Sequence, residues 1–181
     1  MNDLSMHIMD IVYNSIKAKA TLVEINLNYN TNSDILLIEI KDNGTGIEEE
    51  RLNDITSPFT TSRTTRKVGL GLSLFKLTAK QADGNLKITS EFGKYTQVTV
   101  TMKKSHIDCI PIGNLGEAIY LLTINDTNCE IKYSSSVNQK SFTYDSIEIK
   151  ELVGDEIKVN LDVIEWIKSY INENNREIGL N

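Results

Sequence analysis

Apolar residues recur along the first hundred positions at two periods, one typical of helices and the other typical of strands. Near the N-terminus they are three or four residues apart, which predicts a helix over residues 3–18. Two strand-like runs follow, and the second, ILLIEI, is almost wholly apolar. The same reasoning predicts further helices at 48–55 and 70–81 and strands at 22–27, 35–40, 86–90 and 97–102. This order of elements suits helices packed on one face of a mixed sheet.

Residues 104–181 differ in pattern and in charge from the residues before them. The elements predicted there are a helix at 115–124, a strand of which 131–133 is part, a short strand near 142–144, and a final helix that Asn160 can cap. Residues 1–102 hold 11 basic and 12 acidic side chains, whereas residues 103–181 hold 8 and 13. We therefore expect two domains, one at 1–103 and a small acidic α+β domain of unknown role at 104–181.

The composition limits the classes of protein to which this chain can belong. Of its 181 residues, 40% are hydrophobic, enough to bury a sizeable core. The formal net charge of −6 argues against nucleic acid as a partner. No apolar run approaches the roughly 20 residues that cross a membrane, and the N-terminus lacks the features of a secretion signal. We therefore expect a cytoplasmic protein with no membrane or nucleic-acid partner.

Several familiar site patterns are missing from the sequence. It has no GxxxxGK[ST] phosphate loop, and neither glycine pair extends to the dinucleotide pattern GxGxxG. His7 and His106 are too few and too far apart for a zinc cluster. Cys109 and Cys129 fit neither a disulfide framework nor a CxxC site. A nucleotide site in this chain would therefore need a different construction.

Three short stretches carry residues suited to nucleotide chemistry. In the first predicted helix, Asp10 and Asn14 are four residues apart and share a face. DNGTGI follows a predicted strand and places Asp42 beside two glycines. VGLGL stands where a polar, basic and aperiodic loop becomes a helix. On its own DNGTGI also fits a hairpin turn, so its interpretation depends on the other two stretches.

The residue types in these stretches match the parts of a nucleotide. The Asn14 amide can supply an oxygen to Mg²⁺, which prefers oxygen ligands. Asp10, one turn away, can orient a water or a hydroxyl for attack, and Asp42 can accept a hydrogen bond from the exocyclic amine of a purine. Gly69 and Gly71 at a helix start turn free N–H groups toward an anion. Three cations just before them can reach phosphate or stay in solvent, namely Arg63, Arg66 and Lys67.

Together these stretches resemble the boxes of the GHKL superfamily, which includes DNA gyrase, the heat-shock chaperone of ninety kilodaltons, histidine kinases and the mismatch-repair ATPase. HIMDIVYNSIKAKAT resembles the N box, DNGTGI the first glycine box and VGLGLSLFK the second. The stretch from SPFTTS to TQVTV is similar to histidine kinases and to the serine kinases that act as anti-sigma factors. The match, over about residues 3–102, implies a two-layer α/β sandwich of the α+β class, followed here by the small C-terminal domain.

The resemblance implies a role for each matching residue in binding ATP and Mg²⁺. Asn14 would coordinate the metal, Asp42 would read the adenine amine, and Thr96 would assist through a water. Two glycine pairs would clear the base and hinge the phosphate lid, namely Gly44 with Gly46 and Gly69 with Gly71. The other positions placed around the nucleotide are Lys17, Ile47, Thr60, Thr61, Arg63, Arg66, Lys67, Leu70 and Leu72. Lys17 alone also fits an ordinary surface charge.

Two features depart from the family pattern. The general base is a glutamate in the ATPases and in the anti-sigma kinases, whereas this chain has Asp10, which is one methylene shorter. Because a misplacement of about 1 Å can cost roughly a hundredfold in rate, slow hydrolysis or none is consistent with this residue. The N box begins within ten residues of Met1. We therefore expect no phosphoacceptor hairpin before it, and no complete sensor kinase.

Three functions remain open. An ATPase would use Asp10 to orient water, a protein kinase would use it to activate a partner's hydroxyl, and a binding module would sense ATP without turning it over. In all three, closure of residues 57–68 around the γ-phosphate would make a regulatory switch for an unidentified protein partner. A homodimer is also compatible with the resemblance, although no heptad repeat enforces one.

Overall fold

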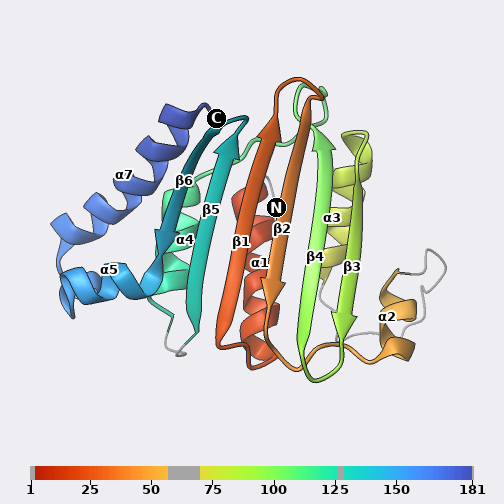
Figure 1. Cartoon of the computed structure of the whole chain (residues 1–181), viewed down its shortest axis with the longest axis horizontal. Coiled ribbons are helices and arrows are strands. Elements are labelled where there is room, and N and C mark those ends of the chain that lie inside the picture. The colour runs from red at the N-terminus through yellow and green to blue at the C-terminus, as the bar shows by residue number, and fades with distance from the viewer. Residues whose placement is uncertain (1–2, 57–69, 126–128, 181) are drawn as a thin grey trace.

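The computed structural model describes residues 3–56, 70–125 and 129–180, which form a six-stranded mixed sheet with helices on one face (Figure 1). The strand order is β3-β4-β2-β1-β5-β6, and only β1 and β5 run parallel among the described neighbours. The strands are β1 (Leu22–Asn30), β2 (Ile35–Asp42), β3 (Asn85–Glu91), β4 (Tyr95–Lys103), β5 (Glu130–Val137) and β6 (Lys140–Asp145). The helices are α1 (Leu4–Lys17), α2 (Glu49–Thr56), α3 (Leu70–Gln81), α4 (Leu115–Thr123), α5 (Ser146–Val153), α6 (Glu156–Val159) and α7 (Leu161–Ile178).

The two faces of the sheet differ because side chains alternate along each strand. In β2, Leu36, Ile38 and Ile40 are buried against the helices. The intervening Glu39 and Lys41 lie on the opposite face. This face is open in Figure 1, whereas α1, α3 and α4 lie behind the sheet. The predicted α+β arrangement, with helices over one face of a mixed sheet, is confirmed.

Helix α1 is the central element of the helical layer. Its N-cap is Asp3, whose carboxylate accepts a hydrogen bond from the backbone N–H of Met6, the first turn's otherwise unpaired donor. Its apolar stripe includes Leu4, Ile8 and Val12, all fully buried. Within the described ranges no helix combines the length and the apolar character needed to cross a membrane.

Residues 104–181 extend the same sheet. β5 pairs in parallel with β1 over eight positions, from Leu22 opposite Glu130 to Tyr29 opposite Val137. The segment before α4 is hydrogen-bonded to the start of α1 through two backbone N–H groups, which donate to the carbonyls of residues 111 and 112 over 2.9 Å. Buried apolar residues from both halves form one cluster. The C-terminal half therefore shares a core with the first.

Three C-terminal elements differ from their predicted extents or were not predicted. β5 contains the predicted 131–133 and continues to Val137, where the pattern gave no bound because Ser135, a polar residue, is buried in the strand and interrupts the apolar alternation. α5 and α6 carry too few buried side chains to show an apolar stripe, since only Ser146 and Ile149 are buried in α5. Asp145 accepts a hydrogen bond from the Ile147 N–H and so caps α5. A cap of this kind is the signal that could have located this helix.

Candidate nucleotide-binding site

Asp42 ends β2 at the lower edge of the sheet in Figure 1, on the helix-covered face. The two-residue period that buries Ile38 and Ile40 continues to this carboxylate, which is only 6% exposed. One carboxylate oxygen accepts a hydrogen bond from the Ser15 hydroxyl over 2.6 Å, and the other accepts one from the Gly44 N–H over 2.9 Å. The acid of DNGTGI is therefore a buried group tied to α1, and not an exposed turn residue.

The glycines that follow Asp42 lie where two backbone segments approach closely. Gly46 has a φ of +65°, and a methyl group there would be 2.2 Å from the Glu91 carbonyl oxygen. At Gly44 a methyl group would be 2.8 Å from the Ala18 carbonyl oxygen. The chain thus passes between the α1–β1 corner and the β3–β4 hairpin. Packing within the protein alone demands glycine at position 46.

Thr96 lies directly opposite Asp42 in the neighbouring strand β4. Its hydroxyl is 3.1 Å from the Ser90 hydroxyl, which donates to the Tyr95 carbonyl and accepts from the Ile47 N–H. The predicted site residues Ile47 and Thr96 therefore share one hydrogen-bonded partner, Ser90. The structure brings these two positions to the same corner of the sheet as Asp42.

Helix α1 brings Asp10 and Asn14 to the flank that faces this corner. Both side chains are half-buried, and Lys17, one turn further on, is exposed. Ser15, on the buried side of the same turn, makes the hydrogen bond to Asp42. Asn14 is thus next in sequence to a residue that contacts the buried acid. The N box and the first glycine box therefore adjoin.

Helix α3 meets α1 at Gly71, which is buried in its first turn. A methyl group at Gly71 would lie 2.0 Å from Oδ2 of Asp10, so the absence of a side chain makes room for that carboxylate. Leu70 begins α3, and Leu72 packs against the core. The second glycine box therefore lies beside the N box. The other predicted residues of this region lie outside the described residues: Thr60, Thr61, Arg63, Arg66, Lys67 and Gly69.

Two residues of the site were not identified from the sequence. Ser15 and Ser90 are short polar residues without a distinctive motif. Ser15 sits in the mostly apolar buried face of α1, at i+4 from Ile11, whose carbonyl its hydroxyl also approaches, at 3.3 Å. A polar residue in the buried stripe of an amphipathic helix is the signal that could have identified it. No comparable signal marks Ser90.

His7 lies on the same helix but is turned into the core. It is 2% exposed and stacks on Phe75 of α3, with ring centroids 4.5 Å apart and an interplanar angle of 9°. Burial lowers the pKa of His7, against the opposing effect of the Asp10 and Asp3 carboxylates. A neutral, stacked imidazole fits a packing role between α1 and α3.

A metal at this corner would have to be held largely by oxygens from the nucleotide. The described residues hold no group of three or more His, Cys, Asp and Glu side chains that could bind a metal ion. Mg²⁺ commonly takes one or two protein oxygens and completes its shell with waters and phosphates. The half-buried Asn14 amide, beside the Asp10 carboxylate on one helix, offers that limited donor set.

The one-sided helical layer and the three boxes gathered at one end of a mixed sheet define the class: this is a GHKL-type ATPase domain. Residues 2–106 match the family described as Histidine kinase-, DNA gyrase B-, and HSP90-like ATPase. Because this match spans more than half of the chain, the chain belongs to that family.

Known relatives agree with this assignment. The chain is 33% identical to the autoinducer 2 sensor kinase/phosphatase LuxQ of Vibrio parahaemolyticus over 84 residues, which is 44% of this chain and 10% of LuxQ. It is 32% identical to sporulation kinase C of Bacillus subtilis over 104 residues, which is 56% of this chain and 24% of the kinase. The chain therefore spans only a small part of these relatives' lengths.

A solved structure supports the fold. The N terminal domain of a DNA repair protein is similar to this chain with a TM-score of 0.51 and 15% sequence identity, over 87% of this chain and 58% of that one. Because the similar region covers 87% of this chain, it extends well beyond residues 2–106 and includes part of the C-terminal half. At this level of identity it shows the fold alone.

Proposed function

We propose that the corner formed by α1, the end of β2 and the start of α3 binds ATP with Mg²⁺. In this proposal the chain is a nucleotide-dependent switch that acts on a protein partner, by ATP hydrolysis or by phosphotransfer. The family membership supports an ATPase-type domain. The choice of ATP, of the metal and of a partner is part of the proposal, as is a cytoplasmic location.

The buried Asp42 carboxylate is the observation that carries the proposal. A buried charge is costly unless it is paired or fully hydrogen-bonded, and Asp42 forms no ion pair with the residues that the structure describes. Its two known donors are Ser15 and Gly44. Since a carboxylate has about four acceptor positions, it can accept two further hydrogen bonds. The exocyclic amine of adenine is a donor of the required kind.

The proposal assigns the remaining roles to residues on the elements around Asp42. Thr96, opposite Asp42 in β4, would assist at the base. Asn14 would give its amide oxygen to the metal, and the exposed Lys17 would reach the phosphates. Asp10 would orient the attacking group. The lid residues that complete the site in this proposal are Thr60, Thr61, Arg63, Arg66, Lys67 and Gly69.

The substitution Asp42→Asn tests the base-reading role. The asparagine keeps the side-chain shape and an acceptor for the Gly44 N–H, and its amide N–H₂ can donate to the Ser15 hydroxyl, so we expect the fold to survive. The N–H₂ group would face the adenine amine with a donor against a donor, and we expect ATP affinity to fall at least about a hundredfold. Titration calorimetry with ATP and Mg²⁺ measures this.

A matched control is Asp34→Asn. Asp34 is an acid at the opposite end of the β1–β2 hairpin that accepts from the Ser105 hydroxyl, and this variant should bind ATP like the parent. If Asp42→Asn retained full ATP affinity, while its thermal melt matched the parent, the assignment of the base pocket would be wrong.

A second candidate function is an ATP-sensing module that does not hydrolyse the nucleotide. The observation in its favour is the shorter Asp10, whose carboxylate lies against the backbone of Gly71. Incubation with γ-labelled ATP, with and without lysate of the source cell, separates the candidates. Label transferred to a second protein indicates a kinase, free labelled phosphate indicates an ATPase, and intact ATP bound to the protein indicates a sensor.

A further inference from the structure

A cavity lies at the other end of α1 from the nucleotide corner, between the segment before α4 and the last turns of α7. Its volume is about 350 Å³. The segment of residues 111–115 forms one wall, and it is hydrogen-bonded to the first residues of α1. Asn14 lies ten residues after Leu4, the first residue of α1, which corresponds to about 15 Å at the rise of an α-helix. None of the predicted nucleotide-site residues lines this cavity.

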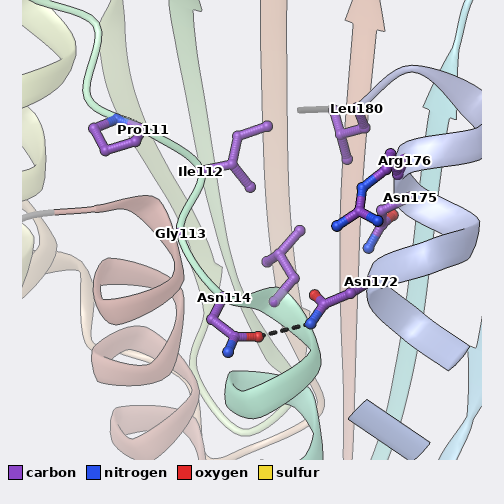
Figure 2. Close-up of a pocket in the computed structure, with 9 residues that line it drawn as sticks. Pro111, Ile112, Gly113, Asn114, Asn172, Asn175, Arg176 and Leu180 are labelled. Carbon is purple, nitrogen blue, oxygen red and sulfur yellow. Dashed lines mark hydrogen bonds between the residues drawn. The ribbon is translucent and has the colours of Figure 1, made fainter. Parts of the chain in front are cut away.

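The walls divide into an apolar part and a polar part. The apolar part consists of Pro111, Ile112, Leu115 and Leu180, of which the last three are nearly fully buried. The polar part consists of asparagines and one arginine from the two helices. Figure 2 shows Arg176 and Asn175 extending from α7 toward the opposite wall, with Asn114 and Asn172 joined below them.

Asn175 carries a buried, unpaired donor in the wall of this cavity. It is 3% exposed, and its amide oxygen accepts hydrogen bonds from the Tyr133 hydroxyl over 2.8 Å and from the Ser135 hydroxyl over 2.6 Å. Burial raises the pKa of Tyr133 to about 12, so this phenol keeps the proton that it donates. Two hydroxyl donors fix the orientation of the amide. Its N–H₂ group therefore turns toward the cavity, where it has no partner among the described residues.

The other polar groups of the wall are held by the start of α4. Asn114 caps this helix and accepts hydrogen bonds from the Glu117 N–H and from the Asn172 amide, while Asn172 accepts one from the Gly116 N–H. The first turn of α4 therefore faces the cavity with its positive end. These bonds hold the two asparagines in place, so the wall is preformed.

Arg176 adds a full positive charge. Its side chain is exposed, it forms no ion pair within the part of the chain that the structure describes, and its guanidinium extends over the cavity (Figure 2). Among the described residues that line the cavity, none is acidic. Asp3 lies behind Gly113, and its carboxylate already accepts from the Ser5 hydroxyl and the Met6 N–H. The polar part therefore offers donors and positive potential toward the cavity.

We propose that this cavity binds a small monocarboxylate. Its carboxylate would lie between the Arg176 guanidinium and the unpaired Asn175 amide, and its short alkyl chain would pack on Ile112, Leu115 and Leu180. Sites for small molecules span about 300–1,000 Å³, so a cavity of about 350 Å³ has ample room for an acid of a few carbons. A phosphate ion would leave the apolar half of the cavity unfilled.

Titration of the full chain with acetate, butyrate and isovalerate, followed by two-dimensional amide NMR, tests the proposal. We expect saturable shifts of the backbone amides of residues 113–116 and of the Asn175 side-chain amide, strongest for the four- and five-carbon acids. Butyramide, which has the same chain without the charge, should cause none. In Arg176→Gln the dissociation constant for butyrate should rise at least about tenfold, because a charge-assisted hydrogen bond is lost.

Lys87→Gln is the matched control. It removes the same charge from an exposed position of β3, at the opposite edge of the sheet from α7, and should leave butyrate binding unchanged. Asn175→Asp keeps the acceptor for Tyr133 and Ser135 and turns an oxygen toward the cavity, so it should abolish binding in a folded protein. The proposal is overturned if none of the acids causes saturable shifts, if Arg176→Gln binds butyrate as the parent does, or if only a peptide with a free C-terminal carboxylate binds.

Discussion

Asp42 shows how one residue links strand geometry to site chemistry. The period of two in β2 places it on the same face as Ile38 and Ile40, so the strand buries a carboxylate at the end of an apolar row. Ser15 and the Gly44 N–H provide the donors that make this burial tolerable. A residue that the alternation alone would make hydrophobic is thus an acid, and it lies where the N box adjoins the sheet.

Asp10 allows a prediction at the same scale. It lies on the α1 flank one turn before Asn14, and its carboxylate contacts the start of α3 and not Asp42. If it orients the attacking group, it contributes little to holding the nucleotide. We therefore expect Asp10→Ala to bind ATP within about threefold of the parent affinity, measured by calorimetry, and to lose any phosphate release or transfer that the parent shows.

Asp108→Asn, at a distant exposed acid, serves as the control and should behave as the parent in both assays. A large loss of ATP affinity in Asp10→Ala would mean that this carboxylate helps to bind the nucleotide or its metal.

At the scale of elements, the first glycine box is a connecting segment held between two other connections, the α1–β1 corner and the β3–β4 hairpin. The Thr45 N–H donates to the Ala18 carbonyl at the α1–β1 corner, and the Thr45 carbonyl accepts from the Gly93 N–H in the β3–β4 hairpin over 2.7 Å. Gly46 sits against the Glu91 carbonyl of the same hairpin. Three elements distant in sequence are thus joined around the turn that follows Asp42.

Gly46→Ala tests whether this close packing contributes to stability. A methyl group would meet the Glu91 backbone, which cannot move aside cheaply, and the residue would also keep a positive φ of 65°. We expect the free energy of unfolding to fall by about 2–4 kcal/mol, the sum of overpacking and backbone strain. Chemical denaturation followed by circular dichroism measures the change.

Gly93→Ala separates the two contributions. Gly93 also has a positive φ, of 81°, but a methyl group there meets no atom within 4 Å. This variant should therefore lose only about 1 kcal/mol to backbone strain. Equal losses at the two glycines would show that the contact with Glu91 is not important.

At the scale of the whole molecule, the two halves of the chain form one sheet and one core. β5 covers the edge of β1 over eight paired positions. Helix α4 packs against α1, and the cluster of buried apolar residues includes Ile119, Leu122 and Ile131 from the second half. The sequence boundary near residue 103 coincides with the end of β4, yet both sides of it contribute to the same structure.

A chain shortened to residues 1–103 tests whether the predicted first domain folds alone. The loss of α4 and β5 would expose the β1 edge and several buried side chains, each worth about 1.5–3 kcal/mol. Since the stability of a whole domain is about 5–15 kcal/mol, we expect the fragment to lack a cooperative thermal transition by circular dichroism, whereas the full chain shows one. A fragment that melted cooperatively within a few degrees of the full chain would show that residues 1–103 are an independent domain.

The sequence by itself determined the elements and the class. Period-two and period-3.6 patterns located α1, α3 and the first four strands, because burial on one face repeats with the geometry of the backbone. The box residues Asp10, Asn14 and Asp42 were evident because their polar side chains interrupt or flank apolar runs in a known order. The resemblance to the GHKL superfamily followed from that order, and the family match supports it.

The tertiary structure decided which of these residues meet and where the second half packs. The pairing of β5 with β1 and the contacts of Ser15 and Ser90 join residues 5 to 108 positions apart in the chain, and no local pattern encodes such pairings. The cavity between α4 and α7 has the same origin. Asn175 and Arg176 look like ordinary polar residues of a surface helix in the sequence, and only the packing of α7 beside α4 places them in the wall of one cavity. Periodicity reports which side of an element is buried, whereas the identity of its neighbours depends on the whole chain.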